Sequence, residues 1–343
     1  MIVVNTFLHT VPQNYSILSR LQTQNGYLYK NFAVAQAASP MKYCFIINNG
    51  PGKTSNAPKI IDAISALDTP IEHRIFKTTA VRTATEFVAA ECRSHPEQEI
   101  CFVACGGDGT INEVATGMMK GGPRNKHLAV LSYGSGNDFI KYYPGLDFRS
   151  IRSLVNGTAH SIDIMKVNGC AYSINVCNFG FDATVCATAN RLTRKGWHNV
   201  YRWGVAYAIF CARFNRIDVT ADGEPLNRGR RMLLCTLGNN NYVGGEFRCS
   251  PRACNDDGLI EVGHVRSISL LNFLRLIKDY RNGTHLDNPA TVGYFTYRRA
   301  RKVEIHSHKP TELCLDGEML PGQDFTVEIV PGAISFIIPS DRN

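Results

Sequence analysis

The chain has 343 residues, of which 44% are hydrophobic and 19% charged, so it has the material for a packed core and the length of two domains. No apolar run reaches the roughly 18 residues that a membrane-spanning helix needs, and the N-terminus lacks the features of a secretory signal, so we expect a soluble, cytoplasmic protein. The formal net charge of +8 favours anionic partners such as nucleotides, acidic lipid headgroups or nucleic acid, without choosing among them.

The 12 cysteines are scattered along the chain, and no Cys-x-x-Cys pair occurs. Neither zinc-site spacing nor a disulfide framework is apparent. Because free cysteine packs as a small hydrophobic residue, the pattern predicts reduced, mostly buried thiols in a reducing compartment.

The first 40 residues contain neither Asp nor Glu, and the first pattern of a buried strand starts only after Met41. We interpret residues 1–40 as an appendage, either disordered or upstream of the true start.

From residue 41 to about residue 160, short apolar strands alternate with amphipathic helices. Strands are predicted at 43–47, 71–78, 100–104 and 127–131, and helices at 59–67, 84–94 and 111–119. This alternation predicts a doubly wound parallel sheet with helices on both faces.

After about residue 160 the pattern changes to strands joined by turns. Strands are predicted at 171–176, 216–220, 232–237, 260–265, 302–306 and 325–330, and helical stretches near 196–213 and 268–281. The segment 161–324 is therefore predicted to form a second, β-rich domain.

One glycine-rich turn directly follows the predicted strand at 100–104 and opens the next predicted helix. Its residues are Gly106, Gly107, Asp108, Gly109, Thr110, Ile111 and Asn112. Glycine lets the backbone approach a phosphate closely, and N–H groups at a helix start face the anion. A carboxylate beside phosphate is repulsive unless it binds a metal ion or hydrogen-bonds the loop, so Asp108 favours a functional role for this turn.

Two further turns follow predicted strands of the same sheet. They comprise Gly134, Ser135, Gly136, Asn137 and Asp138 in one case, and Asn48, Asn49, Gly50, Pro51, Gly52 and Lys53 in the other. Each turn alone is typical of an ordinary loop. Three such turns at the ends of parallel strands, however, meet at one edge of the sheet, where ligands usually bind.

Near the C-terminus, the run Leu315-Asp316-Gly317-Glu318 places two carboxylates in a turn between two predicted β-segments. Most turns of this kind are simple hairpins. This turn is nevertheless a candidate functional turn, because the same sequence also contains the phosphate-type turns described above.

Five motifs together resemble the diacylglycerol kinase catalytic-domain family, which includes bacterial lipid kinases and sphingosine and ceramide kinases. They are GGDGTINEV (106–114), GSGNDF (134–139), NVCNFGFDATV (175–185), PRACNDDGLIEV (251–262) and LDGE (315–318). They occur in the family's order and cover about residues 42–338.

The resemblance implies an N-terminal α/β nucleotide domain over residues 41–160 and a C-terminal β-sandwich domain over 161–324, with the active site in the cleft between them. The last segment, about 325–343, is expected to return to the first domain. The implied reaction is transfer of the γ-phosphate of ATP to a lipid hydroxyl, a step that depends mainly on positioning and electrostatics.

The family's functional residues map onto this sequence one by one. The implied nucleotide contacts are Asn48, Asn49, Gly50, Pro51, Gly52, Thr78, Gly106, Gly107, Asp108, Gly109, Thr110, Ile111, Asn112, Ser135, Asn137 and Asp138. Glu318 resembles the general base, Asp316 lies beside it, and Asp108 is expected to organise the catalytic Mg²⁺ or the phosphate loop. A structural magnesium site maps onto the Asp257 side chain with the carbonyls of Cys254 and Leu259.

Some positions depart from the family pattern. The first turn usually reads Asn-Pro-x-Ser-Gly, whereas residues 48–52 read Asn-Asn-Gly-Pro-Gly, and a triple glycine is replaced by Gly244-Gly245-Glu246. On the lipid side, residues 199–215 form an apolar and basic stretch that fits either an acyl-chain cleft and membrane interface or a helix packed on the β-domain.

Two alternatives stay open: an NAD kinase, which shares the Gly-Gly-Asp-Gly-Thr run, and a non-catalytic lipid- or nucleotide-binding module on the same fold. A membrane-presented lipid is the expected partner, reached by peripheral contact, and a homodimer is left open. Nucleic-acid binding would rest on the basic charge alone, because the sequence contains no recognised nucleic-acid-binding motif, so nucleic acid is not an expected partner. The acceptor lipid is not specified by the sequence.

Overall fold

The structure is a computed structural model that describes residues 21–24, 27–30, 41–48, 56–194, 216–227 and 231–340. The chain divides into two compact units, Met1–Pro40 and Met41–Asn343. In the first unit, strands β1 (Leu21–Gln24) and β2 (Tyr27–Lys30) form an antiparallel hairpin in which Leu21 faces Lys30.

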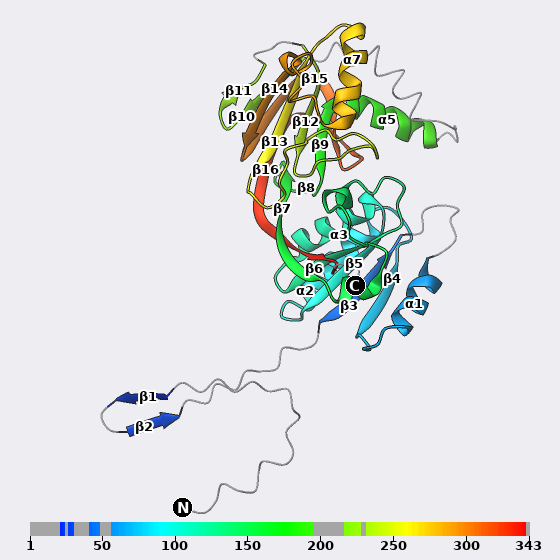
Figure 1. Ribbon diagram of the computed structural model, residues 1–343, viewed down its shortest axis with the longest axis vertical. Coiled ribbons are helices and arrows are strands. Elements are labelled where there is room, and N and C mark those ends of the chain that lie inside the picture. Colours follow the sequence, from blue (N-terminus) through cyan, green and yellow to red (C-terminus); the bar gives the residue numbers. More distant parts are fainter. Residues whose placement is uncertain are drawn as a thin grey trace, which may run out of the picture. The chain divides into compact units, whose positions relative to one another are not determined.

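The second unit begins with a parallel sheet in the order β6-β5-β3-β4 (Figure 1). Its strands are β3 (Lys42–Ile47), β4 (His73–Lys77), β5 (Ile100–Gly106) and β6 (Lys126–Ser132). Every residue of β5 is buried, as expected for a central strand that is covered on both faces.

Helices cover this sheet on both faces, which confirms the predicted doubly wound α/β arrangement. They are α1 (Ala57–Ser65), α2 (Thr83–Ser94), α3 (Asp108–Gly121) and α4 (Ile151–Val155), with a short 3₁₀ helix, η1 (Phe139–Tyr142). One apolar cluster joins α2 and α3 to the side chains of alternate strand residues such as Phe102, and a second joins α1 and α4 to their neighbours such as Val103. Because side chains alternate between the two faces of a strand, the neighbours Phe102 and Val103 pack against the helices on opposite faces of the sheet.

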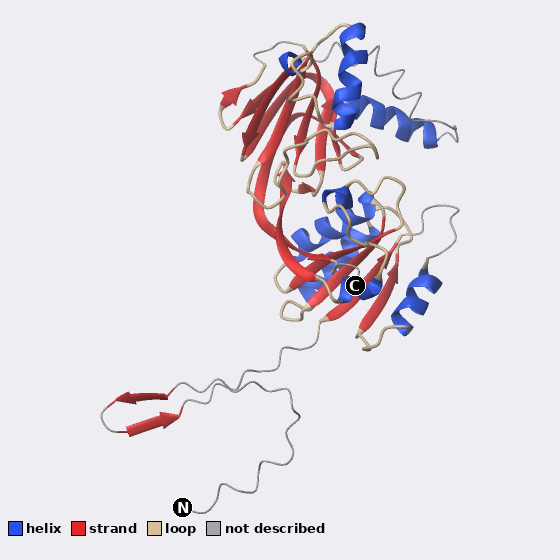
Figure 2. Ribbon diagram, in the orientation of Figure 1, coloured by secondary structure: helices blue, strands red, loops and turns tan. Residues whose placement is uncertain are grey.

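The C-terminal part forms a β-sandwich of antiparallel strands, again as predicted (Figure 2). Its strands are β7 (Thr158–Val167), β8 (Ala171–Ser173), β9 (Val176–Gly180), β10 (Ile217–Ala221), β11 (Glu224–Pro225), β12 (Met232–Gly238), β13 (Ile260–Arg266), β14 (Phe295–Ala300), β15 (Lys302–Leu315) and β16 (Glu318–Ile338). Its helices are α5 (Phe181–Arg194), α7 (Leu270–Asn282) and the 3₁₀ helix η3 (Val292–Tyr294). One cluster of buried side chains fills the sandwich, and a second lies beneath α5 and α7.

Strand β16 belongs to both parts of the second unit. Its first half pairs with β15, starting from the Leu315–Glu318 pair, and its second half pairs with β7. Near its end, Ser335 and Phe336 pair in parallel with β6 of the N-terminal sheet. Figure 1 shows β16 and β7 running side by side from the sandwich to this sheet. The two domains are therefore joined by strand pairing, in addition to the chain itself.

Several elements differ from the sequence prediction. Strand β7, helix α5 and strand β14 were not predicted, and the single strand expected at 171–176 is divided between β8 and β9. The helical stretch expected near 196–213 lies outside the described residues. None of the helices that the structure describes is both long and apolar enough to cross a membrane.

Candidate active site

The turns after β5 and β6 pack directly against each other. Gly106 pairs with Ser132 at the ends of the two strands, and the Tyr133 N–H donates to the Gly106 carbonyl at 2.9 Å. A methyl group added at Gly134 would lie 2.4 Å from the Gly107 Cα. The two backbones therefore meet at a distance that only glycine permits, and both turns lie at one edge of the sheet.

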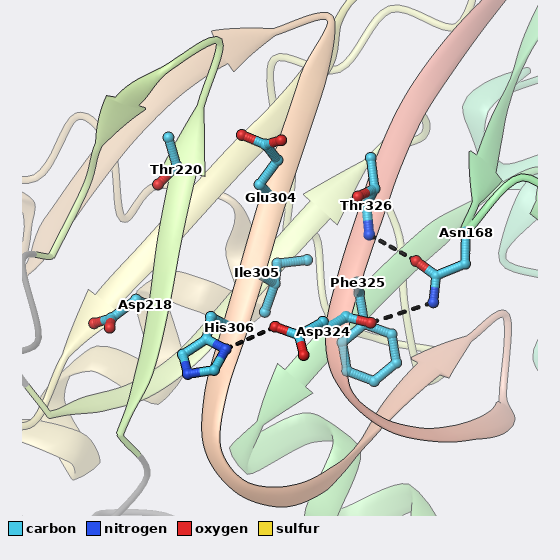
Figure 3. A pocket seen from close by; sticks show the side chains of 9 residues that line it. All are labelled: Asn168, Asp218, Thr220, Glu304, Ile305, His306, Asp324, Phe325 and Thr326. Carbon is cyan, nitrogen blue, oxygen red and sulfur yellow. Dashed lines mark hydrogen bonds and ion pairs between the residues drawn. The ribbon is translucent and has the colours of Figure 1, made fainter.

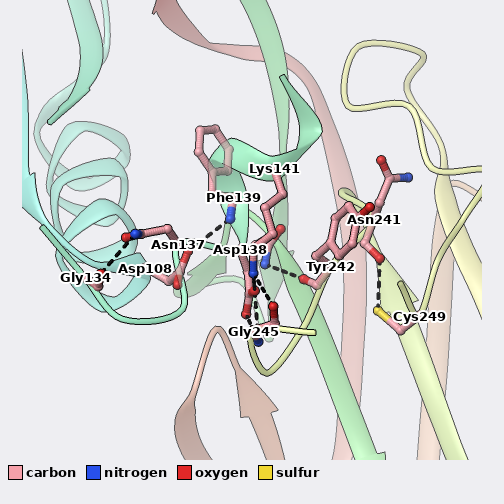
Figure 4. Close-up of polar contacts among 11 residues, drawn as sticks. Asp108, Gly134, Asn137, Asp138, Phe139, Lys141, Asn241, Tyr242, Gly245 and Cys249 are labelled. Carbon is pink, nitrogen blue, oxygen red and sulfur yellow. Dashed lines mark hydrogen bonds and ion pairs between the residues drawn. The ribbon is translucent and has the colours of Figure 1, made fainter. Parts of the chain in front are cut away.

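Asp108 is the first residue of α3, and its carboxylate holds the second turn in place. Its Oδ1 accepts a hydrogen bond from the Phe139 N–H at 3.0 Å (Figure 4). Burial raises the pKa of Asp108, and the nearby charge of Asp138 raises it further, against the lowering effect of the Phe139 N–H. Of the two roles proposed for this carboxylate in the sequence, hydrogen bonding to the loop is the one seen in the structure.

Asp316 and Gly317 form the two-residue turn between β15 and β16. Both have positive φ, 49° and 95°, which is the pattern of a type I′ hairpin. The Asp316 carboxylate accepts hydrogen bonds from three successive backbone N–H groups, those of Ile174 at 2.8 Å, Asn175 at 3.2 Å and Val176 at 2.8 Å. Because these three N–H groups donate to the carboxylate, the strand predicted at 171–176 is interrupted between β8 and β9.

Asn112 of α3 links the glycine-rich turn to the Asp316 turn. With its amide nitrogen facing two acceptors, it donates to Asp316 Oδ2 and to the Tyr172 carbonyl, both at 3.2 Å. Burial raises the pKa of Asp316 to about 6, and the Asp108 carboxylate adds to this effect, although the N–H donors lower it. Residues more than 200 positions apart in the chain thus form one polar centre.

Glu318 begins β16 and is exposed. Burial is the main cause that raises the pKa of Glu113 on α3, and the charge of Glu318 contributes to the rise. The candidate base therefore lies near the helix that carries Asp108 and Asn112.

A second contact joins the domains at Asp138. Its carboxylate accepts from the Gly245 N–H at 3.0 and 3.1 Å and from Lys141 Nζ at 2.7 Å, while Lys141 Nζ also donates to the Gly245 carbonyl at 2.5 Å (Figure 4). Lys141 also lies 5.7 Å from the centre of the Tyr242 ring. Asp138, Lys141 and Gly245 therefore close one side of the site.

Asp108, Asp138, Gly245 and Asp316 line a cleft of about 860 Å³ to which both domains contribute, whereas Glu318 is not among its lining residues. Its polar side includes Asp108, Ser135, Asp138 and Asp316, and its other walls come from β9, α5 and the loop at 243–247. Val176, Val185 and Phe247 make part of these walls apolar. The cleft thus combines a polar end beside the glycine-rich turns with an apolar region, as binding sites for an amphiphile require.

The remaining predicted nucleotide contacts lie near the same edge or outside the described part of the chain. Asn48 and Thr78 follow β3 and β4, where the Thr78 N–H donates to the Ile47 carbonyl at 3.0 Å. Residues Asn49, Gly50, Pro51 and Gly52 lie outside the described residues. Thr110 and Ile111 are buried, and their backbone N–H groups donate to the Gly107 carbonyl at 2.9 and 3.2 Å, so neither N–H is left for a ligand.

The predicted structural magnesium site stays a prediction. The Asp257 carboxylate forms an ion pair with Arg299 and accepts from the Leu259 N–H at 3.0 Å, and Cys254 Sγ lies 2.8 Å from Asp256 Oδ1. Among the described residues, no group of three or more His, Cys, Asp or Glu side chains is arranged to hold a metal ion. A cation at Asp257 would have to replace the Arg299 guanidinium.

A smaller hollow of about 360 Å³ lies on the sandwich and contains none of the predicted site residues (Figure 3). Within it, His306 Nδ1 pairs with Asp324 Oδ1 at 2.6 Å, and the Asn168 side chain accepts from the Thr326 N–H at 2.8 Å. Asp218 and Glu304 of the same hollow pair with His308 and Lys302 outside it, at 3.0 and 2.9 Å, so its charged side chains take part in ion pairs of the kind found on ordinary protein surfaces.

The sequence reasoning missed Lys141, Asn175 and Gly245 as parts of the site. Asn175 lies in a motif that was identified, whereas Lys141 follows such a motif by two residues. Gly245 was noted only as a departure from a triple glycine. Its backbone contact with Asp138 carries no side-chain signal that a sequence pattern could reveal.

Comparison with known proteins follows the same division of the chain. A model described as the diacylglycerol kinase catalytic domain matches residues 42–167, and one described as the YegS C-terminal NAD kinase beta sandwich-like domain matches residues 175–338.

Among curated proteins, the diacylglycerol kinase of Bacillus subtilis (strain 168) is 30% identical over 230 residues, which cover 65% of this chain and 73% of that protein. A protein of Yersinia pestis (strain Pestoides F) named "Probable lipid kinase YegS-like" is 31% identical over 250 residues, covering 69% of this chain and 78% of that protein.

A solved structure of a diacylglycerol kinase from Bacillus anthracis str. Sterne matches with a TM-score of 0.62 and 20% identity, covering 87% of this chain and 96% of that chain. Another solved chain from the same strain gives a TM-score of 0.67 at 21% identity, over 88% of this chain and 98% of that chain. At these identities the structures support the shared fold.

Proposed function

The chain belongs to the diacylglycerol kinase catalytic-domain family of lipid kinases, and on that premise we propose that it transfers the γ-phosphate of ATP to a hydroxyl group of a membrane lipid. The observation that best supports this proposal is the junction of Asn112 with Asp316. It brings the phosphate-type turns of one domain and the carboxylate turn of the other to a single cleft.

The nucleotide is proposed to bind at the edge where β3, β4, β5 and β6 end. Backbone groups of the closely packed turns at 106–109 and 134–136 are suited to phosphate, and the N-terminal end of α3 favours negative charge. Asn48 and Thr78 lie at the neighbouring strand ends. Mg²⁺ accompanying ATP would neutralise phosphate charge, and Asp108 is the candidate carboxylate to hold it, through the oxygen that does not accept from Phe139.

The acceptor hydroxyl requires a base because a lipid alcohol is a weak nucleophile. We assign this role to Glu318, whose carboxylate is exposed at the start of β16. Asp316 is proposed to fix the turn that presents Glu318, since three backbone N–H groups and Asn112 hold its own carboxylate. In this arrangement the hydroxyl proton passes to Glu318 as the oxygen attacks the γ-phosphorus and ADP leaves.

The test is transfer of labelled γ-phosphate from Mg·ATP to a panel of lipids in mixed micelles: diacylglycerol, a sphingoid base, ceramide, a polyprenol and phosphatidylglycerol. A parallel reaction contains NAD, because the sandwich domain also resembles that of NAD kinases. Label in an organic-phase product is expected and identifies the acceptor class. Label only in NAD, or no transfer by protein that still binds ATP, would contradict the proposal.

A further inference from the structure

Helix α7 has two faces of different character. Its inner face packs on the sandwich through Phe273, Leu276 and Tyr280, and the Phe273 ring lies 4.9 Å from that of Phe181 on α5. The helix is capped at its start by the Ser269 hydroxyl, which accepts from the Asn272 N–H, and Gly283 ends it in the left-handed conformation. The orientation of its outer face is therefore well defined.

The outer face of α7 combines exposed leucines with basic side chains. We call it the α7 stripe; it consists of Leu271, Leu274, Arg275, Lys278 and Arg281. Leu271 is 61% exposed and Leu274 58% exposed. The stripe contains no acidic residue, since the one acid of the helix, Asp279, accepts hydrogen bonds from Asn288 and Thr284 on another side.

The α7 stripe ends at the wall of the cleft. Arg281 Nη2 pairs with Glu246 Oε2 at 2.6 Å, and the Arg248 N–H donates to the Arg281 carbonyl at 3.1 Å. Glu246 and its neighbour Phe247 line the cleft itself. A surface that contacts the α7 stripe would therefore lie next to the proposed acceptor site.

We propose that the α7 stripe docks this protein on a bilayer that contains anionic lipids. Leu271 and Leu274 would enter the region between headgroups and acyl chains, while Arg275, Lys278 and Arg281 would contact the anionic headgroups. The proposal rests on the proposed function, in which the acceptor is a membrane lipid, and adds the surface by which the protein reaches it.

A bilayer fits the stripe better than a protein partner does. Two leucines offer far less apolar area than the roughly 800 Å² that each partner buries in a stable protein interface. Their position beside Arg275 and Lys278, and beside Arg281 where it pairs with Glu246, instead matches an anionic surface. A membrane also allows each basic side chain to extend along its own alkyl stem towards a headgroup.

The test is binding of the full chain to sedimented vesicles of phosphatidylcholine, with and without 30% phosphatidylserine, in the absence of ATP and of any acceptor lipid. Leu271→Ser/Leu274→Ser is expected to weaken binding on the order of tenfold or more, because two apolar groups no longer enter the bilayer. Arg275→Gln/Lys278→Gln is expected to weaken it about fivefold for each cation removed, with a reduced dependence on salt.

Matched controls are Ile61→Ser/Val81→Ser and Lys59→Gln/Lys120→Gln, which change exposed residues of the same kinds on the other domain. They are expected to leave vesicle binding unchanged. All variants should retain the wild-type melting temperature, since the altered side chains are exposed.

Three results would overturn the docking surface: unchanged binding by the stripe variants, equal loss in the controls, or conversion of an oligomer to a monomer by the leucine variant, which would mean that a second copy covers the stripe. Activity on lipid in detergent micelles separates the two proposals. A wild-type protein that ignores vesicles but phosphorylates micellar lipid would reject the docking surface alone, whereas vesicle binding without any lipid phosphorylation would reject the kinase function alone.

Discussion

At the scale of single residues, Asp316 and Glu318 lie two positions apart and yet have different surroundings. The Asp316 carboxylate is held by three backbone N–H groups and by Asn112, whereas Glu318 is exposed and its charge contributes to the raised pKa of Glu113. The structure therefore assigns support of the turn to Asp316 and leaves Glu318 free of that structural duty.

This difference predicts different consequences for two conservative substitutions. Asp316→Asn places an amide N–H₂ or a neutral oxygen against backbone donors, so we expect a loss of about 1–3 kcal/mol of stability together with loss of transfer. Glu318→Gln should reduce transfer by a factor of about 10² or more while leaving the melting temperature and ATP binding unchanged. Thermal unfolding, ATP titration and transfer rates separate the two. Equal destabilisation by both variants would contradict the assignment.

The raised pKa of Asp316, about 6, also predicts a pH dependence of activity. Protonation as the pH falls through about 6 removes the charge that orders the three N–H groups, so kcat/KM should decline below pH 6.5. Burial raises the pKa of Asp108 as well, so its protonation acts in the same direction at lower pH. The sign for stability is opposite: a group with a raised folded pKa favours folding below its unfolded pKa and loses that contribution as the pH rises. Transfer rates between pH 5 and 8 that stay constant would contradict this expectation.

At the scale of elements, the closest contact in the site is between the turns after β5 and β6. Gly134→Ala would place a methyl group 2.4 Å from Gly107 Cα and 2.7 Å from Asn137 Oδ1. The turns would have to separate, so we expect lower stability and a large loss of transfer.

Gly109→Ala is the matched control, because no atom lies within 4 Å of its added methyl group. Replacing a helical glycine with alanine should raise stability by up to about 1 kcal/mol. If phosphate approaches this backbone, the same variant should raise the KM for ATP. Melting temperatures that fall equally for both variants would show that the close contact between the turns is unimportant.

The elements that carry phosphate-type turns could be predicted because their signals are local. A buried strand, a glycine-rich turn and an amphipathic helix follow one another around Gly107, and each has a pattern of its own. The division of residues 171–176 into β8 and β9 could not be predicted, because its cause is the Asp316 carboxylate about 140 positions away. The Asp138–Gly245 contact could not be predicted either. Its partners are far apart in the chain, and a backbone N–H donor has no side-chain pattern that a sequence could show.

At the scale of the whole molecule, two buried histidines disfavour folding in acid. His264 is 3% exposed, and neither of its ring nitrogens has a hydrogen-bond partner within the part of the chain that the structure describes. His285 is 1% exposed and packs beside Phe295 and Tyr280. Burial lowers the pKa of each histidine to about 4.

Because these folded pKa values lie below the unfolded value of 6.5, the contribution of each histidine to stability should be complete above pH 6.5 and be lost as the pH falls towards 4, whereas Asp316 acts in the opposite direction below pH 6. Each histidine contributes a slope of about 1.4 kcal/mol per pH unit in this window. His264→Leu removes one proton-binding group and an unpaired polar group, so it should flatten the decline and leave stability at pH 7.5 unchanged or higher. Urea unfolding at several pH values measures both effects, and a variant as acid-sensitive as the wild type would contradict them.

The pairing of β16 with β6 has a consequence for the order in which the protein can assemble. During synthesis the parallel sheet emerges first, but the partner of His127 and Leu128 at its β6 edge is Ser335–Phe336, made some two hundred residues later. Until then that edge exposes unpaired backbone groups, and Phe336 is missing from the cluster it shares with Phe139. The N-terminal sheet can therefore be completed only after residues 335 and 336 have been made, and until then its β6 edge must stay covered or unfolded while the sandwich is still being synthesised.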